Sequence, residues 1–474
     1  MPHLSLLGVR VVDERPYELE LPPGSARDLI FDFGLQVPGT PGDWDPIARK
    51  RFTDAFAASY EGRCGADSLN ELVVRAGLEW QEVSWLRAIS RYLGQLGLPF
   101  SQNYIAEALR ANPILATGLV ELFRAKFDPA AHDAARVTAL TGQLTEELDQ
   151  VASLDQDRIL RSMLSVLAAT VRTNAFRTDD LPGLPAVDRA IALKVLPGQL
   201  TDAPPHPRPA YEVFVDSPRV GGVHLRFGKV ARGGLRWSDR REDFRTEILG
   251  LVKAQMVKNT VIVPVGAKGG FYPKRLPDPS VDRDAWRAEG EACYRIFINA
   301  LLDVTDDLAT GTDGATGSDS PIIRPTDVVC YDDADPYLVV AADKGTASFS
   351  DMANEIAVQR GYWLGDAFAS GGATGYDHKE MGITARGAWE SVKRHFREIG
   401  TDPFNDDFTC VGIGDMSGDV FGNGMLYTPH IGWSPHSTIC TSLSIPIRTR
   451  PPALPNGPGC STSRAPVGPT TTPT

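Results

Sequence analysis

The sequence predicts a multidomain α/β protein with a helical N-terminal region and a disordered tail. Within residues 46–202, apolar residues recur at three- and four-residue spacings, as on one face of a helix. Strand-like and helix-like runs then alternate over residues 211–413, which is typical of an α/β domain. From Tyr427 onward Pro, Thr and Ser predominate while Asp, Glu and Lys are absent, so residues 427–474 are not expected to bury a core.

The composition of the 474 residues is that of an ordinary soluble protein, with 42% hydrophobic and 23% charged residues. At ~100–200 residues per domain, this length predicts two to four domains. The net charge of −12 argues against a nucleic-acid or anionic-membrane binder. No apolar run reaches the ~18–20 residues of a membrane span, and we expect a cytoplasmic protein. Cysteines and histidines are scattered without ligand spacing, so we expect reduced thiols and no metal site.

Residues 1–45 contain two short apolar runs, Leu4 to Val12 and Leu29 to Phe33, separated by Pro and Gly. These runs predict strands at the end of a small β-containing domain. Residues 46–202 follow the helical spacing, for example from Ile105 to Phe123, and contain no catalytic constellation. We therefore expect a helical scaffold in this region.

A Pro-rich segment at residues 203–209 is the expected linker before the α/β domain. Two strand-like runs and a helical run follow at 211–215, 222–227 and 239–257. The apolar run Val261 to Val265 indicates a buried strand, and the Gly-Ala-Lys-Gly-Gly that follows it at 266–270 predicts a tight loop.

Two glycine-rich cationic segments are candidates for binding an anionic ligand. Arg232 and Arg236 lie in Ala-Arg-Gly-Gly-Leu-Arg-Trp, where glycines let the backbone approach a ligand, and each of the two cations could bind a carboxylate. Lys258 follows at the end of the next predicted helix. Lys268, flanked by small residues, could pack against a substrate and act as a general base. A glycine-rich turn with a solvated lysine is the alternative interpretation.

Asp343 ends the apolar run that begins at Val339. An acid at the C-terminal end of a strand in an α/β sheet is well placed to point into a cleft. A carboxylate that caps a helix or a turn explains the same position.

A third motif is the glycine pattern formed by Gly412, Gly414 and Gly418, which follows the strand-like run 408–413. It is one residue longer than the dinucleotide fingerprint GxGxxG. Such glycines let a pyrophosphate rest on a helix N-terminus. The acid expected ~20 residues later to bind a ribose is missing.

Taken together, these segments are similar to the large NAD-specific bacterial glutamate dehydrogenases. The runs that carry the resemblance are Val223 to Asp239, Gly250 to Gly270, Val339 to Phe349 and Gly365 to Gly387. The resemblance extends over about residues 1–426. It implies four parts: the end of an ACT-like regulatory region at 1–45, a helical region at 46–202, an amino-acid-dehydrogenase-like substrate domain with a mixed sheet at 203–400, and an incomplete NAD-binding Rossmann domain at 401–426.

The resemblance also implies roles for single residues. Lys268 matches the lysine that polarises the substrate carbonyl and activates water, and Asp343 matches the acid that moves protons to and from the amino nitrogen. Lys258 matches a lysine that holds a substrate carboxylate. Arg232 stands where the smaller glutamate dehydrogenases carry a carboxylate-binding lysine, so the charge is kept but its geometry differs.

The cofactor-binding residues that the resemblance implies are Thr384, which meets the nicotinamide amide, and the glycines of the pyrophosphate turn, Gly412, Gly414 and Gly418. The implied reaction is the reversible NAD-dependent oxidative deamination of L-glutamate to 2-oxoglutarate and ammonium. A cleft between the substrate and NAD-binding domains is expected, and the intact enzyme is expected to be a homo-oligomer.

The sequence departs from the family pattern after Leu426, as an out-of-frame or truncated reading frame would. Two further interpretations therefore stay open. The chain could be an inactive truncated fragment that acts at most as a binding or assembly module. It could also be another amino-acid dehydrogenase, because similar glycine-lysine loops occur more widely.

Overall fold

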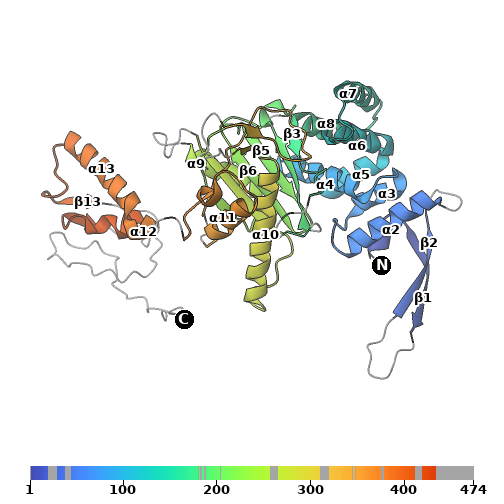
Figure 1. Cartoon of the computed structure of the whole chain (residues 1–474), viewed down its shortest axis with the longest axis horizontal. Helices are drawn as coiled ribbons and strands as arrows, with labels where there is room; N and C mark the ends of the chain where they lie inside the picture. The colour runs from blue at the N-terminus through green and yellow to red at the C-terminus, as the bar shows by residue number, and fades with distance from the viewer. Residues whose placement is uncertain are drawn as a thin grey trace. The chain divides into compact units, whose positions relative to one another are not determined.

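Figure 1 draws the computed structural model of the chain, which divides into two compact units, Met1–Gly372 and Ala373–Thr474. The structure describes residues 2–19, 29–37, 44–179, 181, 184–185, 188–202, 204–256, 265–309, 320–343, 345–346, 348–373, 375, 378–410 and 419–433.

The first unit opens with helix α1 (Pro2–Leu6) and an antiparallel hairpin of β1 (Arg10–Glu18) and β2 (Leu29–Gln36). The strand predicted to start at Leu4 is therefore wrong over its first residues. Pro2 suits the first turn of a helix. The short helix buries Leu4, and it lies against α2 (Pro46–Tyr60), where His3 Nδ1 is 2.8 Å from Ser59 Oγ.

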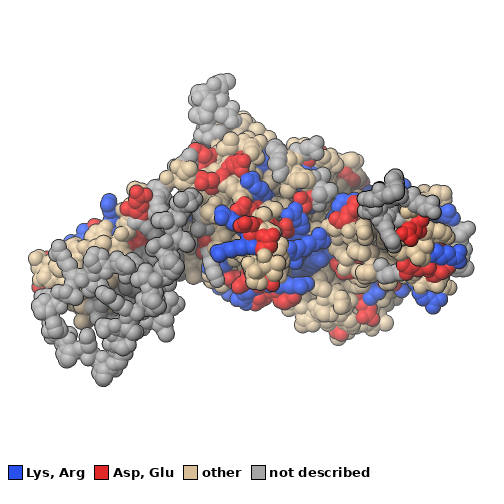
Figure 2. Space-filling view, turned by 90° about the horizontal axis from the view of Figure 1, so that it is seen from below, with Lys and Arg blue, Asp and Glu red and all other residues tan. Residues whose placement is uncertain are grey.

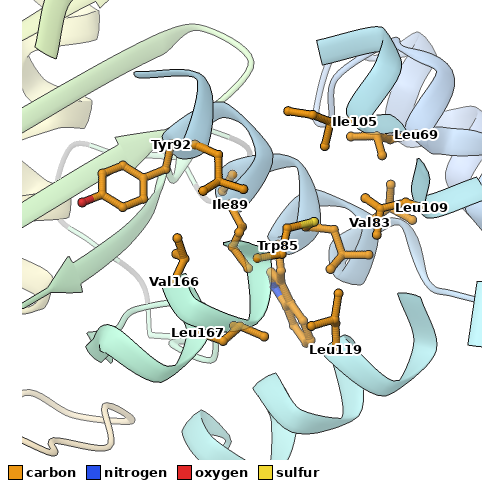
Figure 3. Close-up of a cluster of buried hydrophobic side chains, with 14 of the residues drawn as sticks. Leu69, Val83, Trp85, Ile89, Tyr92, Ile105, Leu109, Leu119, Val166 and Leu167 are labelled. Atoms are coloured by element: carbon orange, nitrogen blue, oxygen red, sulfur yellow. The ribbon is translucent and has the colours of Figure 1, made fainter. Parts of the chain in front are cut away.

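Residues 46–169 are helical, as predicted. Besides α2 the helices are α3 (Leu72–Arg75), α4 (Trp80–Gln95), α5 (Gln102–Ala111), α6 (Pro113–Phe127), α7 (Ala134–Leu148), α8 (Leu154–Ala169) and the short 3-10 helix η1 (Ser68–Glu71). Their apolar faces share one core, in which Val83, Ile89, Leu109 and Leu119 are almost completely buried (Figure 3). Burial of these faces stabilises the helices far more than local propensity does.

A six-stranded mixed sheet forms the centre of the first unit. In spatial order its strands are β3 (Thr170–Thr173), β4 (Ile191–Val195), β5 (Tyr211–Asp216), β6 (Val220–Arg226), β8 (Ala267–Pro273) and β7 (Leu235–Trp237). Neighbouring strands are antiparallel except β7 and β8, which are parallel. The mixed sheet is confirmed. The Pro-rich segment follows β4 and precedes β5, which are neighbours in this sheet. It therefore connects two strands of one sheet, and the prediction that it is a linker ahead of the α/β domain is wrong.

Helices cover both faces of this sheet because successive side chains of a strand point to opposite faces. Leu193 and Phe214 join the core of the helical region, and α9 (Phe244–Gln255) packs on the same face. Ala192, Val213 and Val215 join a second core with α10 (Arg283–Asp303) and α11 (Ser350–Gln359). Figure 1 shows α10 running across the sheet.

The connection after α10 returns to the sheet through a buried network of charges. Asp335 accepts hydrogen bonds from Lys194 of β4 at 2.8 Å and from Arg226 of β6, and all three side chains are at most 5% exposed. Arg172 of β3 pairs with Asp306 at 2.8 Å in the same network. The network fixes the segment that leads to Asp343.

The remaining described elements of the first unit are short: η3 (Pro197–Gln199), β9 (Asp307–Leu308), β10 (Ile322–Ile323), β11 (Val340–Ala341), η4 (Gly365–Ala367) and β12 (Ala369–Ser370). The second unit contains α12 (His378–Met381), α13 (Ile383–Glu398), β13 (Phe408–Cys410), α14 (Asp419–Gly422), η5 (Gly424–Leu426) and β14 (Ile431–Trp433). Strands β13 and β14 are parallel, so residues 431–433 of the predicted tail belong to a strand; residues 434–474 lie outside the described part.

Acidic and basic side chains are intermixed on the face that Figure 2 draws. Among the helices that the structure describes, none is long and apolar enough to cross a lipid bilayer.

Candidate functional site

The register of β7 and β8 places three cations on one face of the sheet. Arg232 pairs with Gly266 and Arg236 pairs with Gly270, both in parallel register. Lys268 lies between these two glycines on the neighbouring strand. Because alternate residues share a face and paired residues point to the same side, Arg232, Arg236 and Lys268 all face the same way.

Asp343 meets this cationic face. It lies two residues after β11, and the intervening Ala342 pairs with Leu235 of β7 in a parallel bridge. Lys268 Nζ donates a hydrogen bond to Asp343 Oδ2 at 2.7 Å, and Arg236 Nη2 lies 3.6 Å from Asp343 Oδ1. The Lys268 and Asp343 side chains are only 15% and 19% exposed. Two candidate residues that are 75 positions apart in the sequence therefore form one ion pair.

Thr346 fixes the position of Asp343, and the sequence analysis missed it. The Asp343 N–H donates to Thr346 Oγ1 at 3.0 Å, while that hydroxyl donates to the Leu235 carbonyl at 2.7 Å. The Thr346 side chain is buried. A threonine three residues after the acid was the available signal, because such hydroxyls often bond to nearby backbone.

Glu247 of α9 is the second residue that the sequence analysis missed. It accepts hydrogen bonds from Arg236 at 3.1 Å and from Ser238 Oγ at 2.6 Å. Arg236 is therefore held by carboxylates on two sides. In the described part of the chain, the guanidinium of Arg232 forms no hydrogen bond or ion pair, so its charge is available to an anionic ligand.

Two glycines allow these elements to approach each other. A Cβ atom on Gly233 would lie 1.4 Å from the Ala267 carbonyl oxygen, and one on Gly234 would lie 3.1 Å from Asp343 Cβ. The prediction of a loop at residues 266–270 is wrong for Ala267 to Gly270. These residues belong to β8, because their glycines fit between β6 and β7 and still pair with both.

We expect a Gly233→Ala substitution to destabilise the first unit by about 3 kcal/mol or more, because the methyl group has no space and the backbone must move. The matched control is Gly250→Ala in the middle of α9, where nothing lies within 4 Å of the new Cβ. That change should be neutral or stabilising by up to about 1 kcal/mol. Urea unfolding measures both; equal stabilities of the two variants would contradict the described packing.

Lys258 lies outside the described residues, and its role stays a prediction. The last residue of α9, Gln255, has its Cβ 3.0 Å from the position that a Gly266 Cβ would occupy. The sequence between Gln255 and Gly266 contains Lys258 and starts and ends beside the cationic face.

In the second unit, Thr384 lies in the first turn of α13 and is exposed. Its N–H donates to Asp419 Oδ2 at 2.7 Å, and Asp419 begins α14. Gly412, Gly414 and Gly418 lie outside the described residues. Strand β13 precedes them in the sequence and helix α14 follows them, and their role in binding a pyrophosphate stays a prediction.

Within the described residues, no group of three or more histidine, cysteine, aspartate or glutamate side chains could hold a metal ion.

Comparison with known proteins gives three consecutive family matches. Residues 1–47 match the ACT3 domain of glutamate dehydrogenase, and residues 64–129 match helical motif 3 of glutamate dehydrogenase. Residues 143–435 match the catalytic domain of bacterial NAD-glutamate dehydrogenase. The last match covers more than half of the chain and includes the Lys268–Asp343 pair.

Curated relatives agree with these matches. The NAD-specific glutamate dehydrogenase of Mycobacterium tuberculosis is 56% identical over 443 residues, which cover 91% of this chain and 27% of the relative. Those of Halomonas elongata and Pseudomonas aeruginosa are 52% and 51% identical, covering 91% and 90% of this chain and 26% of each relative. The chain thus spans about a quarter of the length of these relatives, and it belongs to the bacterial NAD-specific glutamate dehydrogenase family.

Proposed function

We propose that this chain carries the substrate site of a glutamate dehydrogenase, which converts L-glutamate, NAD and water reversibly to 2-oxoglutarate, ammonium and NADH. The observation that carries the proposal is the Lys268–Asp343 ion pair on a face that also presents Arg232. A dicarboxylic amino acid needs two cations for its carboxylates and a proton-transfer group near its α-carbon. This face supplies both kinds of group.

Each residue has a role in that proposal. Arg232 and Lys258 bind the two carboxylates and thereby orient the α-carbon. Asp343 accepts a proton from the α-amino group as the carbon–nitrogen double bond forms. Lys268 Nζ then assists water as it adds to that bond and stabilises the charge on the new carbinolamine oxygen. Asp343 returns a proton to the nitrogen, which leaves as ammonium.

NAD, when bound, accepts the hydride that leaves the α-carbon. Thr384 would hold the nicotinamide amide, and Gly412, Gly414 and Gly418 would hold the pyrophosphate. A second candidate function is substrate binding without turnover. One observation supports this second candidate. The sheet in the described part of the second unit has two strands, whereas a complete dinucleotide-binding domain, which turnover needs, has six.

The test is NADH formation by the purified chain with L-glutamate, compared with leucine, valine and phenylalanine. We expect glutamate to be the preferred substrate and Lys268→Ala to remove turnover. Turnover that persists in Lys268→Ala would contradict the proposed site, and a preference for leucine would favour another amino-acid dehydrogenase.

Calorimetric titration with 2-oxoglutarate distinguishes the second candidate. Binding that requires Lys268, without NADH formation, would identify a substrate-binding module. The absence of both turnover and Lys268-dependent binding would refute both functions for this chain.

A further inference from the structure

A cavity of about 370 Å³ lies in the first unit between the helical region and the sheet. It is lined by α4, by the connection between β3 and β4, and by the residues that follow α2 and β5. Neither Lys268 nor Asp343 lines it. The cavity is therefore separate from the proposed substrate site. Its lining residues come from both the helical-motif match and the catalytic-domain match.

Arginines from three parts of the chain line this cavity: Arg63, Arg87, Arg91, Arg177 and Arg189. Four of them each have a carboxylate oxygen within hydrogen-bond distance. These pairs are Arg63–Glu61 at 2.6 Å, Arg87–Asp67 at 2.7 Å, Arg91–Asp216 at 2.9 Å and Arg177–Asp179 at 2.5 Å. Their charges are locally compensated, although a guanidinium has donors to spare.

Arg189 differs from the other four. It donates to the carbonyl oxygens of Arg177, at 2.6 Å, and of Asp179, and its nearest carboxylate oxygen, Asp179 Oδ1, is 3.6 Å away. Among the described residues its buried Nε has no hydrogen-bond partner, and the side chain is 16% exposed. Arg189 and Asp179 thus form an ion pair without a hydrogen bond, and a ligand carboxylate that hydrogen-bonds to Arg189 would add to the compensation of this largely buried cation.

The rest of the lining combines aromatic and aliphatic residues with polar ones such as Gln81, Ser84 and Asn174. Trp80 and Trp85 line the cavity, and the Arg63 guanidinium lies over the Trp80 ring at 5.4 Å from its centroid. Small-molecule sites usually combine such an apolar lining with a few polar groups that orient the ligand. Inorganic anions would leave the aromatic part of this cavity unused.

We propose that this cavity binds a small organic carboxylate with a flat apolar body, whose carboxylate meets Arg189 beside Arg177 while its body lies against Trp80. Arg91, which also lines the cavity, pairs with Asp216, and Asp216 accepts a second hydrogen bond from Lys274 at 2.5 Å. Lys274 directly follows β8, the strand that carries Lys268. Two ion pairs thus connect Arg91, in the cavity wall, to the end of the strand that carries Lys268.

The experiment is calorimetric titration of the whole chain with benzoate, in the absence of NAD and glutamate. We expect saturable binding with a Kd of about 1 mM or tighter, close to −4 kcal/mol. Arg189→Gln should weaken it at least tenfold, and Trp80→Leu should weaken it as well. The matched control is Arg394→Gln in α13, an exposed arginine paired with Glu398, which should leave the Kd unchanged.

The proposal would be overturned by no saturable binding of benzoate, by an unchanged Kd in Arg189→Gln and Trp80→Leu, or by equally tight binding of inorganic phosphate. If Arg189→Gln does not fold, as judged by circular dichroism, Arg63→Gln replaces it, because Arg63 also lines the cavity and, among the described residues, forms an ion pair only with the exposed Glu61. Benzoate binding that is lost in Lys268→Ala would place the ligand in the substrate site and also overturn the proposal. Since no turnover is measured, failure here does not affect the proposed dehydrogenase function.

Discussion

Replacing Asp343 with Asn should lower kcat for glutamate oxidation by about 10³-fold and change KM by less than about threefold. Asparagine keeps the size of the side chain and can still contact Lys268, but it cannot accept a proton from the substrate amine. Positioned acid–base groups contribute about 10²- to 10⁴-fold to rates, so the loss belongs to kcat. Steady-state NADH formation by the chain measures both constants.

The control for this substitution is Asp366→Asn, an exposed carboxylate of η4 that should have no effect on kcat. Lys268→Ala and Asp343→Asn should also be strongly non-additive when combined, because the two side chains form one ion pair. A variant at Asp343 that raises only KM would show that this residue binds substrate without moving protons. If the chain binds 2-oxoglutarate without turnover, Asp343→Asn should bind it at least as tightly, because a negative charge is removed beside the ligand.

Asp335→Asn should reduce the free energy of unfolding by about 3–5 kcal/mol, since it removes a buried carboxylate that pairs with two buried cations. Lys194 and Arg226 would remain inside the protein with one carboxylate fewer between them. The matched control is Asp333→Asn, two residues earlier, where the carboxylate is 87% exposed and lies 3.3 Å from Lys229. Exposed pairs of this kind contribute at most about 1 kcal/mol. Urea unfolding at pH 7 measures the difference, and similar losses in both variants would contradict the network.

The same residue predicts an acid dependence of stability. Burial opposes ionisation of Asp335, but Arg226 and Lys194 outweigh it and hold the pKa of this carboxyl well below its usual value. A carboxyl with a lowered folded-state pKa contributes its full stability above the unfolded value of about 3.9, and the contribution is lost as the pH falls toward the folded pKa. The free energy of unfolding of the wild-type chain should therefore fall more steeply below about pH 4 than that of Asp335→Asn. Parallel slopes would refute this assignment.

Local patterns were sufficient for much of the fold. The helical region follows from three- and four-residue apolar spacing, since each helix buries one face in a shared core. The helix at residues 2–6 was missed because a five-residue helix is too short to show a period. The loop predicted at 266–270 was wrong because glycine normally weakens a strand, whereas here close neighbours on both sides require it.

Some residues of the candidate site could likewise be selected from the sequence, and others could not. Lys268, Asp343 and Arg232 could be selected from their types and their glycine-rich or strand-end surroundings, and family resemblance supplied their roles. Thr346, Glu247 and the compensation of Arg236 were missed, because these contacts join residues whose spacing carries no period.

By itself, the sequence determined the family, the mixture of helices and strands, and the chemical types of the site residues, because side-chain periodicity and local motifs are properties of short stretches of chain. Only the tertiary structure decided that Lys268 and Asp343 form an ion pair and that five arginines surround one cavity. These contacts depend on strand register and on where connections return to the sheet, and a shift of one residue in β8 would turn Lys268 to the opposite face.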